Sequence, residues 1–243
     1  VVFLEDGELV KVDHGGYQIF TIGSLKPVTH QVMTIKWDMQ SAQKGGYRHF
    51  MLKEIFEQPR VIVDGLTGRV DPEEGSVRLR ELDSLNVPER LHIVACGTSY
   101  HAGLWGRYLI ENWAQIPVQV EIASEFRYRD RLLLGKKDMV LVISQSGETA
   151  LRIAKKNGVP LLGLCNVVGS SIAREADSVL YTQAGPEISV ASTKAMCSQM
   201  LMLCLMALYW GERRGVTDAG FRKSVIRSLL DLPGKLEKAL PDM

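Results

Sequence analysis

The second half of the chain alternates short apolar runs with longer amphipathic stretches. An apolar run without polar alternation is typical of a strand that is buried on both faces of a parallel sheet. The amphipathic stretches between the runs have the spacing of helices. This alternation predicts an α/β fold, a doubly wound parallel sheet of about five strands with helices on both faces. The expected strands are residues 91–95, 118–122, 140–143, 161–165 and 178–181.

Helices are expected between and after these strands. The first covers residues 100 to about 113, a long one follows Ser192 to about residue 210, and a last amphipathic helix covers residues 219–232 before Pro233. A short helix over residues 50–56 should end at Pro59, because proline cannot continue a helix from its interior.

The beginning of the chain has a different pattern. Apolar residues 1–4 and 8–12 flank Glu5-Asp6-Gly7, which indicates a hairpin, and residues 17–22 and 32–35 add two further strands. Residues 1–46 therefore predict a small β-meander, which is too short to bury a core by itself. Residues 47–90 follow as a connector, and residues 91–243 hold the α/β domain with its last helix.

The strand over residues 140–143 ends in the sequence Ser-Gln-Ser-Gly-Glu-Thr, residues 144–149. A strand that turns into a helix directs free backbone N–H groups beyond the sheet, and the helix dipole favours an anion there. The loop contains hydroxyl donors and a glycine but no lysine or arginine, which fits a small phosphorylated ligand. A Ser/Gly-rich turn can also be only a helix cap, and Glu148 fits such a cap better than a catalytic base.

Two more strand ends repeat this arrangement. Cys96-Gly97-Thr98-Ser99 follows the strand 91–95, and residues 185–194 join the strand 178–181 to the long helix. The carboxyl ends of neighbouring parallel strands form the crevice in which open α/β folds bind ligands. Three such loops favour a binding site over simple capping.

These three loops resemble the phosphosugar-binding loops of sugar isomerase (SIS) domains. Together with residues 47–59 and 121–128, they are most similar to the first SIS domain of the glutamine–fructose-6-phosphate aminotransferase (isomerising) family. The resemblance covers nearly the whole chain and is weakest over residues 64–88. It implies an enzyme of hexosamine biosynthesis, a glutamine amidotransferase that forms glucosamine 6-phosphate from fructose 6-phosphate and glutamine.

The resemblance also implies the role of each loop. The phosphate would be bound by Ser99, Ser144, Gln145, Ser146 and Thr149, and the sugar by Cys96, Gly97, Thr98, Val190 and Ser192. The segment 1–46 would be the end of the glutaminase domain. The catalytic cysteine, base, histidine and lysine of the family would all lie outside this chain. The implied assembly is a homodimer through SIS domains, and no cofactor is implied.

Composition fits this interpretation. The chain has 243 residues, of which 46% are hydrophobic and 23% charged, and its net charge of +1 gives no reason to expect nucleic acid or a membrane surface as a partner. No apolar run approaches the ~20 residues of a membrane span. The four cysteines and five histidines lack metal-ligand spacing. We therefore expect a cytoplasmic protein with free thiols and no metal.

Two points remain open from the sequence. SIS domains also occur as sensors or regulators that bind a phosphosugar without converting it, but no basic helix-turn-helix pattern occurs in residues 1–90, as a transcriptional regulator would need. Only eight residues separate Thr149 from Gly158, which is short for a crossover helix between parallel strands. Either this chain carries a deletion, or residues are absent from the printed sequence.

Overall fold

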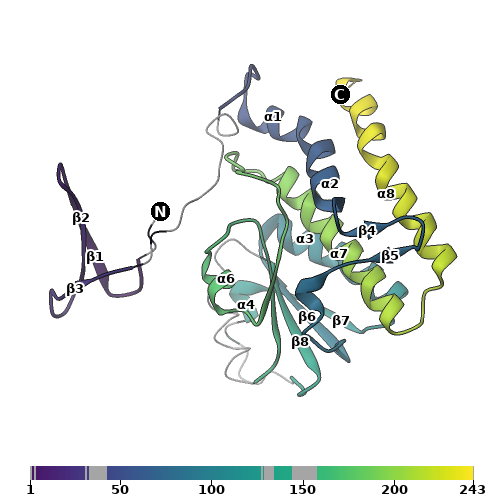
Figure 1. Ribbon diagram of the computed structural model, residues 1–243, viewed down its shortest axis with the longest axis horizontal. Coiled ribbons are helices and arrows are strands. Elements are labelled where there is room, and N and C mark those ends of the chain that lie inside the picture. Colours follow the sequence, from purple (N-terminus) through teal and green to yellow (C-terminus); the bar gives the residue numbers. More distant parts are fainter. Residues whose placement is uncertain are drawn as a thin grey trace. The chain divides into compact units, whose positions relative to one another are not determined.

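The computed structural model describes residues 2, 4–30, 32, 43–126, 128, 134–143 and 158–242. The chain divides into two compact units, Val1–Trp37 and Asp38–Met243. The first contains a small antiparallel sheet, and the second contains a parallel sheet with helices on both faces (Figure 1).

The N-terminal unit contains β1 (Glu8–Asp13), β2 (Gly16–Thr21) and β3 (Pro27–Val28), paired antiparallel in the order β1-β2-β3. The expected hairpin around residues 5–7 is wrong. Strand β1 pairs with β2 instead, because Asp13 accepts the N–H of Gly15 (2.9 Å) and Gly16 takes a positive φ, which closes a tight turn there. Val2 and Leu4 lie in no strand. Of the strand expected over 32–35, residues 33–35 lie outside the described residues.

The central sheet of the second unit confirms the predicted fold class. In the part of the chain that the structure describes, five parallel strands follow the order β10-β9-β8-β6-β7. Residues 144–157, on which the question of a shortened crossover rests, lie outside the described part. The strand bounds are β6 Arg90–Ala95, β7 Val118–Ile122, β8 Asp138–Ile143, β9 Leu161–Cys165 and β10 Ser178–Tyr181.

Side chains of the sheet alternate between two cores. In β8, Met139, Leu141 and Ile143 belong to the larger core, whereas Val140 and Val142 belong to the smaller one on the opposite face. All five are at most 1% exposed, which explains the unbroken apolar run. The larger core is covered by α2 (Gln58–Leu66), α3 (Gly97–Leu109), the π-helical turn η2 (Ile110–Ala114), α7 (Lys194–Arg213) and α8 (Ala219–Ala239). The smaller core includes residues of α4 (Ala123–Phe126) and α6 (Ser171–Glu175).

The connector is more regular than the sequence suggested. Helix α1 (Phe50–Phe56) has the expected bounds, but Pro59 lies in the first turn of α2 and does not end a helical region. Proline is tolerated there because the first N–H groups of a helix have no intrahelical partner. The connector also forms a hairpin of β4 (Val70–Asp71) and β5 (Ser76–Val77) and the 3₁₀ turn η1 (Arg80–Leu82).

The last helix, α8, also extends beyond its expected end. It passes through Pro233 to Ala239 and is followed by the 3₁₀ turn η3 (Leu240–Asp242). Leu232 and Leu236, on either side of the proline, both pack against the larger core. This packing outweighs the hydrogen bond that proline removes.

Candidate functional site

The strand order places a topological switch point between β6 and β8. Strand β6 is followed in sequence by β7 on one side, and the next strand, β8, pairs with β6 on its other side. In open α/β sheets, ligands bind beyond the carboxyl ends of the strands at such a point. Ala95 and Ile143 are paired across these two strands. Two of the loops singled out from sequence therefore start next to each other.

The loop after β6 leads directly into α3. Cys96 is extended (φ −129°, ψ 161°) and makes no side-chain capping bond, and Gly97 opens the helix with a φ of +56°. The N–H groups of Gly97, Thr98 and Ser99 belong to the first turn, which has no intrahelical acceptor for them. Helix α3 thus presents backbone donors at the switch point, where its dipole favours an anion, and Ser99 lies in its first turn.

The second loop, residues 144–149, follows β8. Ser144, Gln145, Ser146 and Thr149 lie outside the described residues. The structure establishes only where the segment starts, at the carboxyl end of β8 beside β6. The roles of these four residues stay predictions.

The third loop, residues 182–193, joins β10 to α7 without regular secondary structure of its own. Its first part is bound to Asn166, which follows β9: the Asn166 side chain accepts from Thr182 Oγ1 (3.0 Å) and from the N–H of Ala184 (2.9 Å), and donates to the Gly185 carbonyl (2.6 Å). Val190 is fully exposed, and Ser192 is half-buried. The loop is therefore held at its base and presents Val190 to solvent.

The end of the third loop is fixed by carboxylates. Glu187 accepts the N–H groups of Thr193 (2.9 Å) and Ala195 (3.2 Å) at the start of α7. Glu54 in α1 accepts those of Ile188 (2.6 Å) and Ser189 (3.3 Å). Sequence reasoning did not assign these roles, although Glu54 belongs to one of the stretches that carried the family resemblance.

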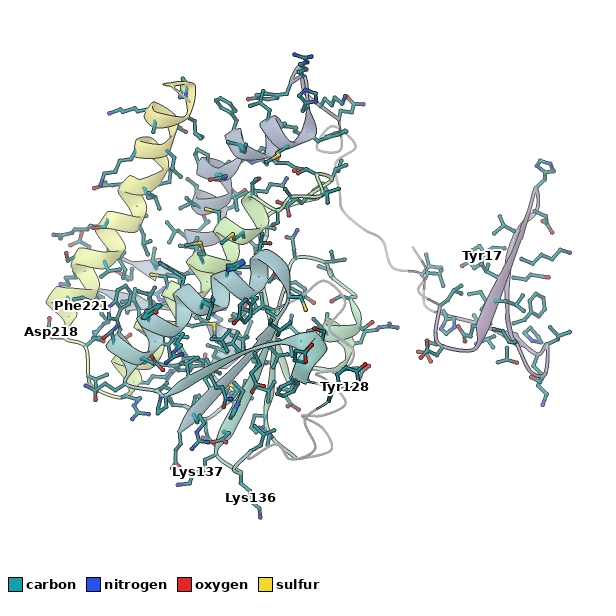
Figure 2. The ribbon with its side chains drawn as sticks, turned by 180° about the vertical axis from the view of Figure 1, so that it is seen from behind. Tyr17, Tyr128, Lys136, Lys137, Asp218 and Phe221 are labelled. Atoms are coloured by element: carbon teal, nitrogen blue, oxygen red, sulfur yellow. The ribbon has the colours of Figure 1, made fainter. Side chains whose placement is uncertain are left out.

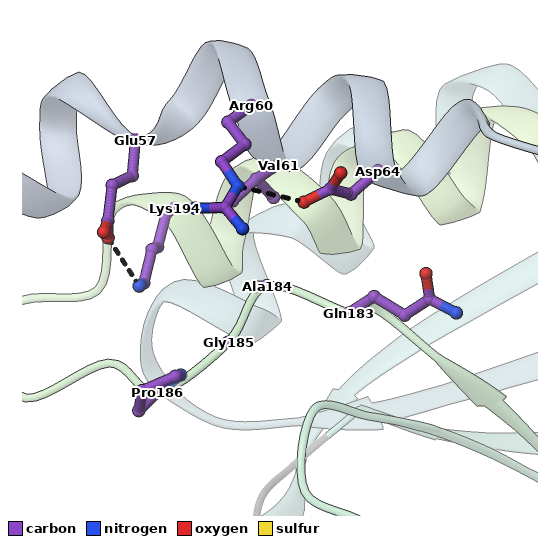
Figure 3. A pocket seen from close by; sticks show the side chains of 9 residues that line it. All are labelled: Glu57, Arg60, Val61, Asp64, Gln183, Ala184, Gly185, Pro186 and Lys194. Carbon is purple, nitrogen blue, oxygen red and sulfur yellow. Dashed lines mark hydrogen bonds and ion pairs between the residues drawn. The ribbon is translucent and has the colours of Figure 1, made fainter. Parts of the chain in front are cut away.

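Lys194, the first residue of α7, does not face open solvent. Its Nζ lies 2.7 Å from Glu57 Oε2 (Figure 3), and the side chain is 3% exposed. The pair lies in a pocket that Gln183, Gly185 and Pro186 line from the loop side. The lysine is therefore part of the anchorage of the loop.

Charged side chains around the sheet restrict where a phosphate can bind. Lys136 and Lys137 precede β8 and so lie at the amino edge, opposite the loops, where Lys137 donates to Glu89 (2.6 Å; Figure 2). On the β7 side of α3, Glu121 and Glu125 line a hollow at the carboxyl edge. Carboxylates disfavour a phosphate dianion. The β8 side of α3 is the better place for one.

The remaining chemistry of the described residues is limited. All four cysteines are free thiols. Burial raises the pKa of Cys165 and Cys197, and that of Cys204 to about 12, which makes these thiols poor nucleophiles. Among the described residues, no group of histidine, cysteine or carboxylate side chains is arranged to hold a metal ion, and no helix is long and apolar enough for a membrane span.

Comparison with known proteins agrees with this geometry. Residues 84–209 match the family model described as SIS domain, and the chain belongs to this family. It is 46% identical over 97% of its length to the glutamine–fructose-6-phosphate aminotransferase (isomerizing) of Chlorobaculum tepidum, and 45% identical over 99% to that of Clostridium perfringens. The resemblance noted in the sequence is confirmed. The chain spans about two fifths of the length of these relatives.

A solved structure is similar as well. The C-terminal domain of glucosamine-fructose-6-phosphate aminotransferase from Francisella tularensis superposes with a TM-score of 0.73 at 36% identity, over 79% of this chain and 56% of that one. This similarity supports the parallel α/β fold described above.

Proposed function

We propose that this chain binds the phosphosugar substrate of an enzyme that makes glucosamine 6-phosphate from fructose 6-phosphate and glutamine. The observation that carries the proposal is the start of α3 at the switch point, where backbone N–H groups and Ser99 follow directly on β6. The names of the relatives, which are aminotransferases acting on fructose 6-phosphate, support the choice of substrate.

The phosphate would be bound without a cationic side chain. Helix-terminal N–H groups and hydroxyls are sufficient donors for a small dianion. We assign the phosphate to Ser99, Ser144, Gln145, Ser146 and Thr149, and the sugar to Cys96, Gly97, Thr98, Val190 and Ser192. The assignment follows the family resemblance and agrees with the acidic hollow on the other side of α3, which disfavours an anion.

The organisation of the parent protein belongs to the same proposal. Residues 1–46 would be the end of a glutaminase domain, residues 47–90 a connector, and residues 91–243 the first SIS domain with its last helix. The parent enzyme would act in the cytoplasm as a homodimer through its SIS domains.

Calorimetric titration with fructose 6-phosphate, with fructose as the unphosphorylated control, tests the proposal. Ser146→Ala and Thr149→Ala each remove a hydrogen bond to a charged acceptor, which typically costs ~1.5–3 kcal/mol, or about tenfold to a hundredfold in affinity. Ser228→Ala is the matched control, because its hydroxyl donates to the Ser224 carbonyl on the exposed face of α8. Equal affinity for the two sugars, or unchanged affinity in both loop variants, contradicts the proposal.

A further inference from the structure

The third loop depends on a helix that is distant in sequence. The side chain of Glu54, in α1, is 134 positions away from Ile188, yet it accepts the N–H groups of Ile188 and Ser189 at 2.6 and 3.3 Å. Glu54 is 2% exposed. Hydrogen bonds to an ionised acceptor are about twice as strong as neutral ones, so a buried carboxylate is an effective anchor for two backbone donors.

A second contact joins the same two regions. Glu57, which follows α1, pairs with Lys194 Nζ at 2.7 Å and with Lys53 Nζ at 3.4 Å. Lys194 is the first residue of α7, immediately after the third loop (Figure 3). Residues 188–194 are thus attached to the α1 region at both ends, by Glu54 at one end and by Glu57 at the other.

The residues between these two anchors are the ones assigned to the sugar. Val190 follows directly on Ser189, and Ser192 lies two residues before Lys194. Fixing the backbone of 188–189 and the side chain of 194 restricts the conformations open to the segment between them. A loop that is already ordered loses little conformational entropy when ligand binds. Binding is therefore stronger by the free energy that ordering the loop would otherwise cost.

We propose that Glu54 is a positioning residue for sugar recognition: it holds the backbone of Ile188 and Ser189 so that Val190 and Ser192 meet the sugar, without touching the ligand itself. The inference rests on the proposed function, because it takes the third loop as the sugar loop. It adds α1, a part of the connector, to the determinants of the site.

The proposal separates sugar affinity from phosphate affinity. The two backbone donors that Glu54 accepts lie in the third loop, which is assigned to the sugar. We therefore expect Glu54→Ala to weaken binding of fructose 6-phosphate about tenfold or more while binding of inorganic phosphate changes less than twofold. Glu54→Gln keeps an oxygen acceptor without its charge, and hydrogen bonds to a neutral acceptor are about half as strong. We therefore expect the affinity for fructose 6-phosphate to fall about two- to fivefold and the affinity for inorganic phosphate to stay unchanged. Calorimetric titration of the full chain with both ligands measures this ratio.

A matched control is Glu111→Ala. Glu111 also accepts a backbone N–H, that of Val118 at 3.1 Å, but at the amino edge of β7, opposite the loops. We expect Glu111→Ala to leave the ratio of the two affinities unchanged. A change in that ratio equal to the change in Glu54→Ala would show a general effect of destabilisation and would overturn the proposal.

The other outcomes are equally decisive. The role of Glu54 is overturned if Glu54→Ala keeps the wild-type ratio of affinities for fructose 6-phosphate and inorganic phosphate. This includes the case in which both affinities fall by the same factor. Where Glu54→Ala shows no cooperative thermal unfolding, Glu54→Gln decides: a selective loss for fructose 6-phosphate supports the role, and an unchanged ratio overturns it. A wild-type chain that binds fructose 6-phosphate no better than inorganic phosphate overturns the proposed function, and the role of Glu54 with it.

Discussion

Replacing Glu57 by glutamine isolates a buried positive charge. Lys194 is 3% exposed, and in the part of the chain that the structure describes, Glu57 is the carboxylate within ion-pair distance of it. Removing one partner of a buried pair costs about 3–5 kcal/mol, because the other charge stays desolvated. Glu57 is 22% exposed, so water can reach the site, and we expect Glu57→Gln to lower the free energy of unfolding by about 2–3 kcal/mol.

The opposite substitution should cost much less. Lys194→Met keeps a similar apolar chain in the protein, and Glu57 still has Lys53 at 3.4 Å. Replacing a buried charge by an apolar group of similar volume is often close to neutral, so we expect a change within about 1 kcal/mol. In the double variant the charge left unpaired by Glu57→Gln is gone. The double variant should therefore be more stable than Glu57→Gln alone, with a coupling energy of about 2 kcal/mol between the two positions.

Urea unfolding followed by tryptophan fluorescence measures these differences, since Trp210 is buried in the larger core. The control is Arg60→Gln, which breaks the neighbouring Arg60–Asp64 pair (3.5 Å). The Arg60 side chain is 80% exposed and that of Asp64 44%, and such exposed pairs stabilise a protein by only about 0.5 kcal/mol. A loss below 1 kcal/mol in Glu57→Gln, or a double variant no more stable than Glu57→Gln, would refute the reasoning.

Three further predictions concern the core and its thiols. A Cβ at position 106 would lie 2.8–3.1 Å from Leu203 side-chain atoms, so Gly106→Ala should destabilise the protein by about 1–3 kcal/mol through overpacking between α3 and α7; a thermal midpoint unchanged from wild type would contradict this. Burial raises the pKa of Cys204 to about 12, so an aromatic disulfide reagent at pH 8 should modify exposed Cys96 and spare Cys204. Since the unfolded thiol ionises near pH 9, this group should lower stability as pH rises from 9 to about 12; urea midpoints that stay constant over that range in wild type relative to Cys204→Ala would count against it.

Local patterns were sufficient for the elements of the α/β unit. Strands β7, β9 and β10 have the predicted bounds. Strand β9 is buried along its whole length and therefore needs a continuous apolar run, whatever packs against it. Helix α1 was likewise predicted with its observed bounds. The loops at the ends of β6 and β8 were singled out from their hydroxyl and glycine content, and the topology then placed their starting points side by side.

Pairing and packing were decided by the tertiary structure. The sequence marks a turn at residues 5–7, but β1 pairs with β2, since the turn at Gly15 closes an antiparallel ladder of six residue pairs. Pro59 and Pro233 were taken as helix ends. Pro59 lies in the first turn of α2, where its missing N–H costs nothing. Pro233 lies inside α8, and the packing of the leucines around it outweighs the hydrogen bond that it removes.

The anchors of the third loop show the same division. That a loop joins β10 to the long helix α7 could be predicted from the chain alone, although its expected bounds, 185–194, differ from the observed 182–193. That Glu54 and Glu57 hold it could not, because a contact between positions more than 130 residues apart leaves no periodicity or spacing in the sequence. Apolar patterns report the surface that each segment must bury. Which carboxylate meets which backbone donor is determined only when the packed helices bring the two together.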